Sequence, residues 1–172
     1  MDLTKYKTIQ NEIHSGDLIE WKSNNLVGRL IRLFTKKDVN HTSLCIRLQD
    51  CENYEKPHRF ILEANARGIE LHLLSKSIEG YNGRAYYYRL KPEHDAVREG
   101  IVQWALIQVG TKYDYKSLFK NILGSVNADA KRFFCSEFAY LAYRQVSIVN
   151  DGKSPRPGEF GKFNLFLNRI EL

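Results

Sequence analysis

The sequence lacks the features that mark several large classes of protein. No apolar run approaches the roughly 20 residues needed to cross a bilayer, and residues 1–6 are polar rather than a charged and then apolar leader. The three cysteines are an odd number without framework spacing, which argues against a disulfide scaffold. These absences predict a cytoplasmic protein of a reducing compartment, with neither a signal peptide nor a transmembrane segment.

Motifs for nucleotide, serine and metal chemistry are missing as well. The chain has no glycine-rich phosphate loop, and none of its serines lies in a nucleophile elbow. A metal site would have to use Cys45, Cys51 and His58, but their spacing matches no zinc pattern and a fourth ligand is not evident. We therefore expect neither a metal nor a cofactor.

Composition and charge predict a globular protein without a specific nucleic-acid partner. The 172 residues are 43% hydrophobic and 12% aromatic, which is enough for a packed core, and we expect one domain over residues 1–172. The net charge of +6 is spread along the chain, so it gives no reason to expect specific nucleic-acid binding. The densest basic run lies between Leu26 and Lys37, on a predicted amphipathic helix that is either an ordinary solvated helix or a contact with a membrane surface.

Hydrophobic periodicity predicts an α+β fold, in which several antiparallel strands are flanked by helices. Strands are expected near residues 18–21, 41–48, 59–64, 69–73 and 85–90, and helices near 26–34, 97–108 and from 135 onward. Because side chains alternate along a strand, His41 should share a face with Ser43 and Cys45. Glu63 should face opposite to Leu62, so hairpin-like neighbouring strands would bring it beside His41.

A cysteine lies where an apolar run turns into an amphipathic helix. A helix N-terminus stabilises a thiolate, which favours Cys135 as a nucleophile, although a cysteine taken alone is more often an inert core thiol. His41 can take the thiol proton and later give it to a leaving amine. Glu63 can fix the tautomer of that histidine, although a carboxylate on a strand is commonly a solvent-facing residue. The three residues predict a cysteine nucleophile with a base and an orienting carboxylate.

Five short motifs follow one another along the chain: Gly16-Asp17-Leu18-Ile19, Asn40-His41-Thr42-Ser43-Leu44, Leu62-Glu63-Ala64, Gly110-Thr111-Lys112-Tyr113-Asp114 and Phe134-Cys135-Ser136-Glu137-Phe138. In this order they resemble the permuted members of the NlpC/P60 papain-like superfamily, and within it the YiiX/YebB-like cysteine hydrolases. The resemblance implies a permuted papain-like fold with an antiparallel sheet or small barrel flanked by helices. It also implies Cys135 as nucleophile, His41 as base and Glu63 as the orienting residue, with Tyr113 and Asp114 structural or lining the pocket.

The resemblance further implies hydrolysis of an amide bond, in a peptide or an acyl-amide, through a thioester intermediate. Permuted relatives include lipid-directed acyltransferases, so a thiol acyltransferase or hydrolase acting on lipid is an alternative. In that case the segment from Leu26 to Lys37 would be the membrane-docking face. A non-catalytic binding module on the same fold is the remaining alternative.

Overall fold

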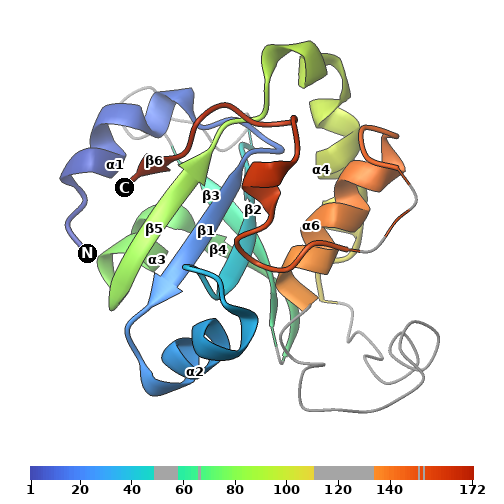
Figure 1. Ribbon diagram of the computed structural model, residues 1–172. Helices are drawn as coiled ribbons and strands as arrows, with labels where there is room; N and C mark the ends of the chain where they lie inside the picture. Colours follow the sequence, from blue (N-terminus) through green and yellow to red (C-terminus); the bar gives the residue numbers. More distant parts are fainter. Residues whose placement is uncertain (49–57, 66, 111–133, 151, 153) are drawn as a thin grey trace.

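The computed structural model describes residues 1–48, 58–65, 67–110, 134–150, 152 and 154–172. Its centre is a six-stranded sheet in the order β4-β3-β2-β1-β5-β6, in which every neighbouring pair is antiparallel (Figure 1). The strands are β1 (Leu18–Ser23), β2 (His41–Ile46), β3 (Phe60–Asn65), β4 (Gly68–Leu73), β5 (Gly83–Tyr88) and β6 (Ile170–Glu171). The antiparallel sheet expected from the alternating sequence pattern is confirmed.

Helices cover both faces of this sheet. They are α1 (Thr4–Ile9), α2 (Leu26–Thr35), α3 (Leu74–Glu79), α4 (Arg98–Ile107) and α6 (Phe134–Gln145), with short 3-10 helices at Gln10–Glu12, Pro92–Val97 and Phe160–Lys162. Helices α4 and α6 pack side by side on one face, whereas α1 and α3 lie on the other (Figure 1). Within the described part of the chain, no helix is both long enough and apolar enough to span a membrane.

Two apolar cores result, one on each face of the sheet. Along β2, Leu44 and Ile46 point into the core under α4 and α6, while Cys45 points into the opposite core with Trp21 and Ile61. The alternation predicted for this strand is therefore correct. The face of β2 that carries His41 is apolar too, because Cys45 on the same face packs into the second core.

The two short helices α1 and α3 were not expected from the sequence. Among its six residues α1 buries only Tyr6, and α3 buries only Leu74 and Ile78. One or two buried side chains are too few to produce a helical period in a sequence. These helices form because the second face of the sheet needs a cover, which is a tertiary requirement.

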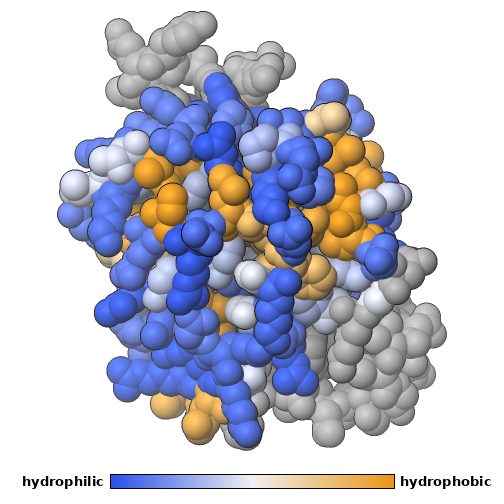
Figure 2. Space-filling model, turned by 45° about the horizontal axis from the view of Figure 1, so that its top comes forward, coloured by the Kyte–Doolittle hydropathy of each residue, from blue (hydrophilic) through white to orange (hydrophobic). Residues whose placement is uncertain are grey.

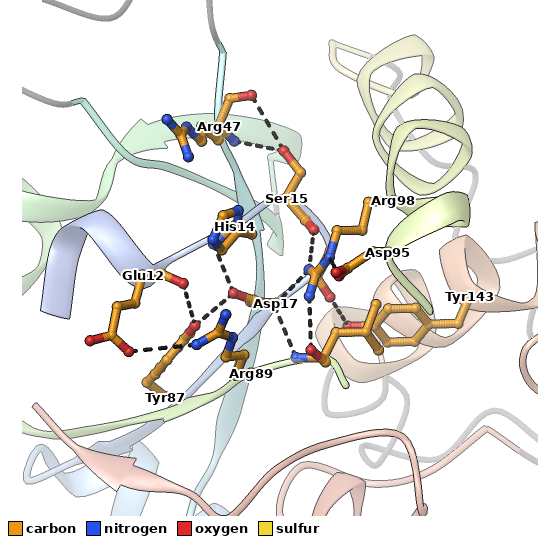
Figure 3. A network of polar contacts seen from close by, with 12 residues as sticks. Glu12, His14, Ser15, Asp17, Arg47, Tyr87, Arg89, Asp95, Arg98 and Tyr143 are labelled. Carbon is orange, nitrogen blue, oxygen red and sulfur yellow. Dashed lines mark hydrogen bonds and ion pairs between the residues drawn. The ribbon is translucent and has the colours of Figure 1, made fainter. Parts of the chain in front are cut away.

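A buried carboxylate holds the start of β1 (Figure 3). Asp17 is fully buried, and its Oδ2 accepts hydrogen bonds from the His14 backbone N–H at 2.8 Å and the Tyr87 hydroxyl at 2.7 Å. Its Oδ1 accepts from the Leu90 N–H at 2.9 Å and from Arg98 Nη1 at 2.8 Å. Four donors, one of them the Arg98 cation, compensate the lost hydration of the carboxylate. Asp17 thus ties β1 to β5 and α4.

The glycine before this carboxylate connects the same point to α6. Gly16 has a φ of +84°, which a residue with a side chain rarely adopts, and a Cβ there would lie 3.2 Å from Ile101 Cδ1. Its carbonyl accepts a hydrogen bond from the buried hydroxyl of Tyr143 at 2.8 Å (Figure 3). The Gly16-Asp17 motif is therefore structural, and it fixes the helix that carries Cys135 relative to the sheet.

Candidate active site

Cys135 lies in the first turn of α6 and is buried. The helix packs against β2 and β3 through Phe138, Ala139 and Ala142, and the ring of Phe138 lies 5.8 Å from that of Trp104 on α4. Helix α6 starts at the lower end of the sheet in Figure 1, the end at which β2 begins. The packing of the helix therefore presents the thiol to the first residues of β2.

His41 is the first residue of β2 and meets the thiol there. Its strand position is set by pairing with Trp21 on β1, and the preceding Asn40 N–H donates to the Trp21 carbonyl at 2.8 Å. The Cys135 sulfur lies close enough to the imidazole to raise the pKa of His41. The imidazole Nε2 lies 3.5 Å from Glu63 Oε1. The structure thus brings together Cys135, His41 and Glu63, which the sequence analysis selected.

Glu63 is held by two residues that the sequence analysis did not assign to the site. The Ser43 hydroxyl donates to Glu63 Oε1 at 2.7 Å, and Trp21 Nε1–H donates to Ser43 Oγ at 2.7 Å. Trp21 and Ser43 are themselves buried. Alternation had placed Ser43 on the face of His41, but only the strand register shows that Ser43 lies opposite Glu63.

The charges of the site favour an ion pair. Burial alone would raise the pKa of Glu63, but hydrogen bonds from His41 and Ser43 lower that pKa to about 2, so the carboxylate is ionised at neutral pH. Burial alone would lower the pKa of His41, but the neighbouring Cys135 and Glu63 raise it well above its ordinary value. The arrangement therefore stabilises an imidazolium between a sulfur and a carboxylate.

Helix α2 is attached to the strand of His41 by one arginine. Arg32 Nη1 donates to the Ser23 carbonyl and, at 3.1 Å, to Asn40 Oδ1. The same Asn40 oxygen accepts the Ser23 N–H at 2.7 Å. Because Asn40 precedes His41, the position of α2 and that of the imidazole are linked.

The remaining candidates from the sequence contribute nothing to this geometry. Tyr113 and Asp114, expected as pocket-lining residues, lie outside the described residues, as does Cys51. Cys45 is fully buried in the core on the α1 and α3 face, where burial raises the pKa of its thiol well above the ordinary value. Among the residues that the structure describes, no group of three or more His, Cys, Asp or Glu side chains could hold a metal ion.

Comparison with known proteins agrees with this geometry. Residues 12–161 match the family described as permuted papain-like amidase enzymes, YaeF/YiiX, C92. The chain belongs to this amidase family. The YiiX-like resemblance and the permuted papain-like fold expected from the five motifs are thereby confirmed, and so is the class of a cysteine hydrolase acting on amide bonds.

A solved structure supports the fold of this YaeF/YiiX amidase. The chain is similar to the crystal structure of the metalloprotein yiiX from Escherichia coli O157:H7, with a TM-score of 0.55 and 21% sequence identity. The similarity covers 81% of this chain and 69% of the other. No curated protein matches the chain.

Proposed function

We propose that this amidase hydrolyses a peptide or acyl-amide bond with Cys135 as nucleophile, His41 as acid and base, and Glu63 as the residue that orients His41. The observation that supports this assignment is that the Cys135 sulfur and the Glu63 carboxylate both lie beside the His41 imidazole. Each of the three groups is held by a different element, α6, β2 and β3, so the geometry is fixed by the packing of the fold.

In the first step, the Cys135 thiolate attacks the carbonyl carbon of the substrate and the carbonyl oxygen becomes an oxyanion. Backbone N–H groups at the start of α6 are oriented to stabilise that charge, since the first N–H groups of a helix have no partner within it. The His41 imidazolium then gives its proton to the leaving nitrogen as the C–N bond breaks. An amine departs, and the acyl group remains on sulfur as a thioester.

In the second step, neutral His41 takes a proton from water, and the resulting hydroxide adds to the thioester carbon. The C–S bond breaks, the carboxylic acid leaves, and the thiolate and imidazolium are restored. Water can reach the base because the side chain of His41 is 25% exposed. Glu63, held by Ser43, keeps the ring aligned in both steps.

A lipid-directed thiol acyltransferase or hydrolase is the second candidate. The observation that favours it is the exposed leucine side of α2, the helix that Arg32 joins to the strand of His41. In an acyl transfer, the hydroxyl or amine of an acceptor would replace water in the second step. The first step would be the same.

Two further parts of the proposal concern a metal ion and the cellular compartment of the protein. The yiiX structure is described as that of a metalloprotein, whereas the two steps proposed above use only side chains, backbone N–H groups and water. We also propose a cytoplasmic location, because the three cysteines follow no disulfide framework, as is usual for proteins of a reducing compartment.

The test is the pH dependence of alkylation of Cys135 by iodoacetamide, followed by mass spectrometry. A free thiol with a pKa near 8.5 is about 0.3% ionised at pH 6 and reacts correspondingly slowly. We expect Cys135 to react at pH 6 within about tenfold of its rate at pH 8.5, and His41→Ala to slow the pH 6 reaction about 100-fold.

Two controls belong to this test. Cys45 in the same molecule should stay unreactive, because it is fully buried. His94→Ala removes a histidine of the 3-10 helix Pro92–Val97 that lies beside Glu93 rather than in the site, and it should leave the profile of Cys135 unchanged. A Cys135 that behaves as a free thiol, or whose rate does not depend on His41, would refute the assignment and favour a non-catalytic binding module.

A further inference from the structure

Helix α2 presents apolar side chains to solvent instead of to the protein. Leu26 is 73% exposed and Leu33 is 72% exposed, and Val27 and Leu30 are exposed as well. At 100° per residue the three leucines fall within about 60° of one another around the helix axis. They therefore form one continuous stripe, which we call the leucine stripe of α2.

This stripe is unusual for the molecule. The face shown in Figure 2 is mostly hydrophilic, with orange groups across its upper half and on its right side, and a smaller orange group at the lower edge, where α2 lies in Figure 1. Both faces of the sheet are already covered by other helices, so among the described residues the stripe has no free apolar surface to pack against. Four of the eight large apolar side chains found exposed in the described residues belong to this one helix, which marks α2 as a contact surface.

The charges around the stripe have one sign. Between Trp21 and Asp38 the sequence has no acidic residue and five basic ones: Lys22, Arg29, Arg32, Lys36 and Lys37. Arg32 binds Asn40, and Lys37 pairs with Glu159 at 2.9 Å. Arg29 and Lys36 are exposed and make no ion pair with a described residue. Arg29 lies about 40° from Leu33 around the helix axis, which places a free cation at the border of the stripe.

We propose that α2 docks this protein on an anionic lipid bilayer, with the leucine stripe among the acyl chains near the headgroups and Arg29 and Lys36 on lipid phosphates. An apolar stripe bordered by cations is the pattern of a helix that lies in the plane of a membrane interface. A second copy of the chain fits the stripe less well, because a twofold contact would bring the same cations together on a protein of charge +6.

Docking through α2 would bring the site to the lipid surface. The helix ends at Thr35, six residues before His41, and the hydrogen bond from Arg32 to Asn40 joins the helix to the strand of the imidazole. The docking itself does not depend on the chemistry of Cys135. If both proposals hold, the acyl group of the substrate can come from the membrane.

The experiment is flotation of the full chain with vesicles of phosphatidylcholine, alone or with 30% phosphatidylserine, in about 50 and 500 mM NaCl. We expect binding to the phosphatidylserine vesicles at low salt and binding at least tenfold weaker without the anionic lipid or at high salt. The double variant Leu26→Ser, Leu33→Ser should weaken binding at least tenfold. Arg29→Gln should weaken it about fivefold, as expected for one cation near an anionic surface.

Matched controls separate the stripe from exposed residues in general. Ile107→Ser removes an aliphatic side chain that is 75% exposed on α4, and Lys5→Gln removes an exposed cation on α1. Both should bind the vesicles like the parent protein. Alkylation of Cys135 should also be unchanged in the α2 variants, so a failure of docking is distinguishable from a failure of the catalytic assignment.

Three results would overturn the proposal. One is the absence of binding to anionic vesicles at low salt, and another is binding that the α2 variants do not weaken. The third is a dimer in light scattering that Leu26→Ser, Leu33→Ser converts to a monomer, since the stripe would then be covered by a second copy of the chain.

Discussion

Glu20 should make this protein lose stability as the pH rises through neutrality. It lies on β1 and is fully buried, and its Oε1 accepts the Gly158 N–H at 2.7 Å. Its Oε2 is buried without a hydrogen-bond partner among the described residues, and so is the hydroxyl of the facing Thr42. A carboxylate held in this way lacks the donors that ionisation requires.

The size and the sign of the effect follow from the pKa. Burial, opposed only in part by the Gly158 N–H and the Tyr88 hydroxyl, raises the pKa of Glu20 from its ordinary 4.5 to about 7. That rise corresponds to about 3 kcal/mol. Because the folded pKa lies above the unfolded one, the contribution is fully present below pH 4.5 and is lost as the pH rises through 7. Glu20→Gln removes the titration and should leave the hydrogen bond from Gly158 in place.

The assay is urea unfolding at a series of pH values, monitored by tryptophan fluorescence. The difference in unfolding free energy between the parent and Glu20→Gln should shift by about 3 kcal/mol in favour of the variant between pH 4.5 and pH 8.5. Glu79→Gln is the control. Glu79 is exposed and its pKa is lowered by Lys76, so it stays ionised over this range. A difference for Glu20→Gln that stays constant within about 0.5 kcal/mol from pH 4.5 to 8.5 would refute the reasoning.

Two further predictions concern buried hydroxyl groups, one beside Glu63 and one at the Gly16 carbonyl. Ser43→Ala removes the donor to Glu63 and leaves buried Trp21 Nε1–H without an acceptor, so it should lower the unfolding free energy by about 1–3 kcal/mol. Thr42→Val is the matched control in urea unfolding, because the Thr42 hydroxyl has no partner among the described residues; equal losses in both variants would contradict the account of Ser43. Tyr143→Phe removes the hydrogen bond to the Gly16 carbonyl and should cost about 1 kcal/mol in the same assay, while Cys135 alkylation at pH 6 is unchanged. A Tyr143→Phe variant of unchanged stability would show that this bond does not hold α6 to β1.

The sequence predicted the elements that repeat a simple pattern. Alternating side chains placed the strand of His41 and assigned its faces, because the period of a strand is fixed by its backbone. The order of the five motifs predicted the family, since each motif consists of a few adjacent residues that can be recognised in the sequence alone. The basic amphipathic character of α2 could be recognised in the same way. The role of its apolar side remained open, because such a side can be buried in the protein, exposed to solvent or docked on a partner.

Tertiary structure decided what depends on residues far apart in the chain. The support of Glu63 by Ser43 and Trp21 requires the register of three strands, and hydrogen bonds between strands set that register. The contact of Cys135 with His41 spans 94 positions of the sequence, and it exists because α6 packs against β2 and β3 with its N-terminus at the start of β2. Exposure of the α2 stripe was decided in the same way, because the other helices already cover the sheet.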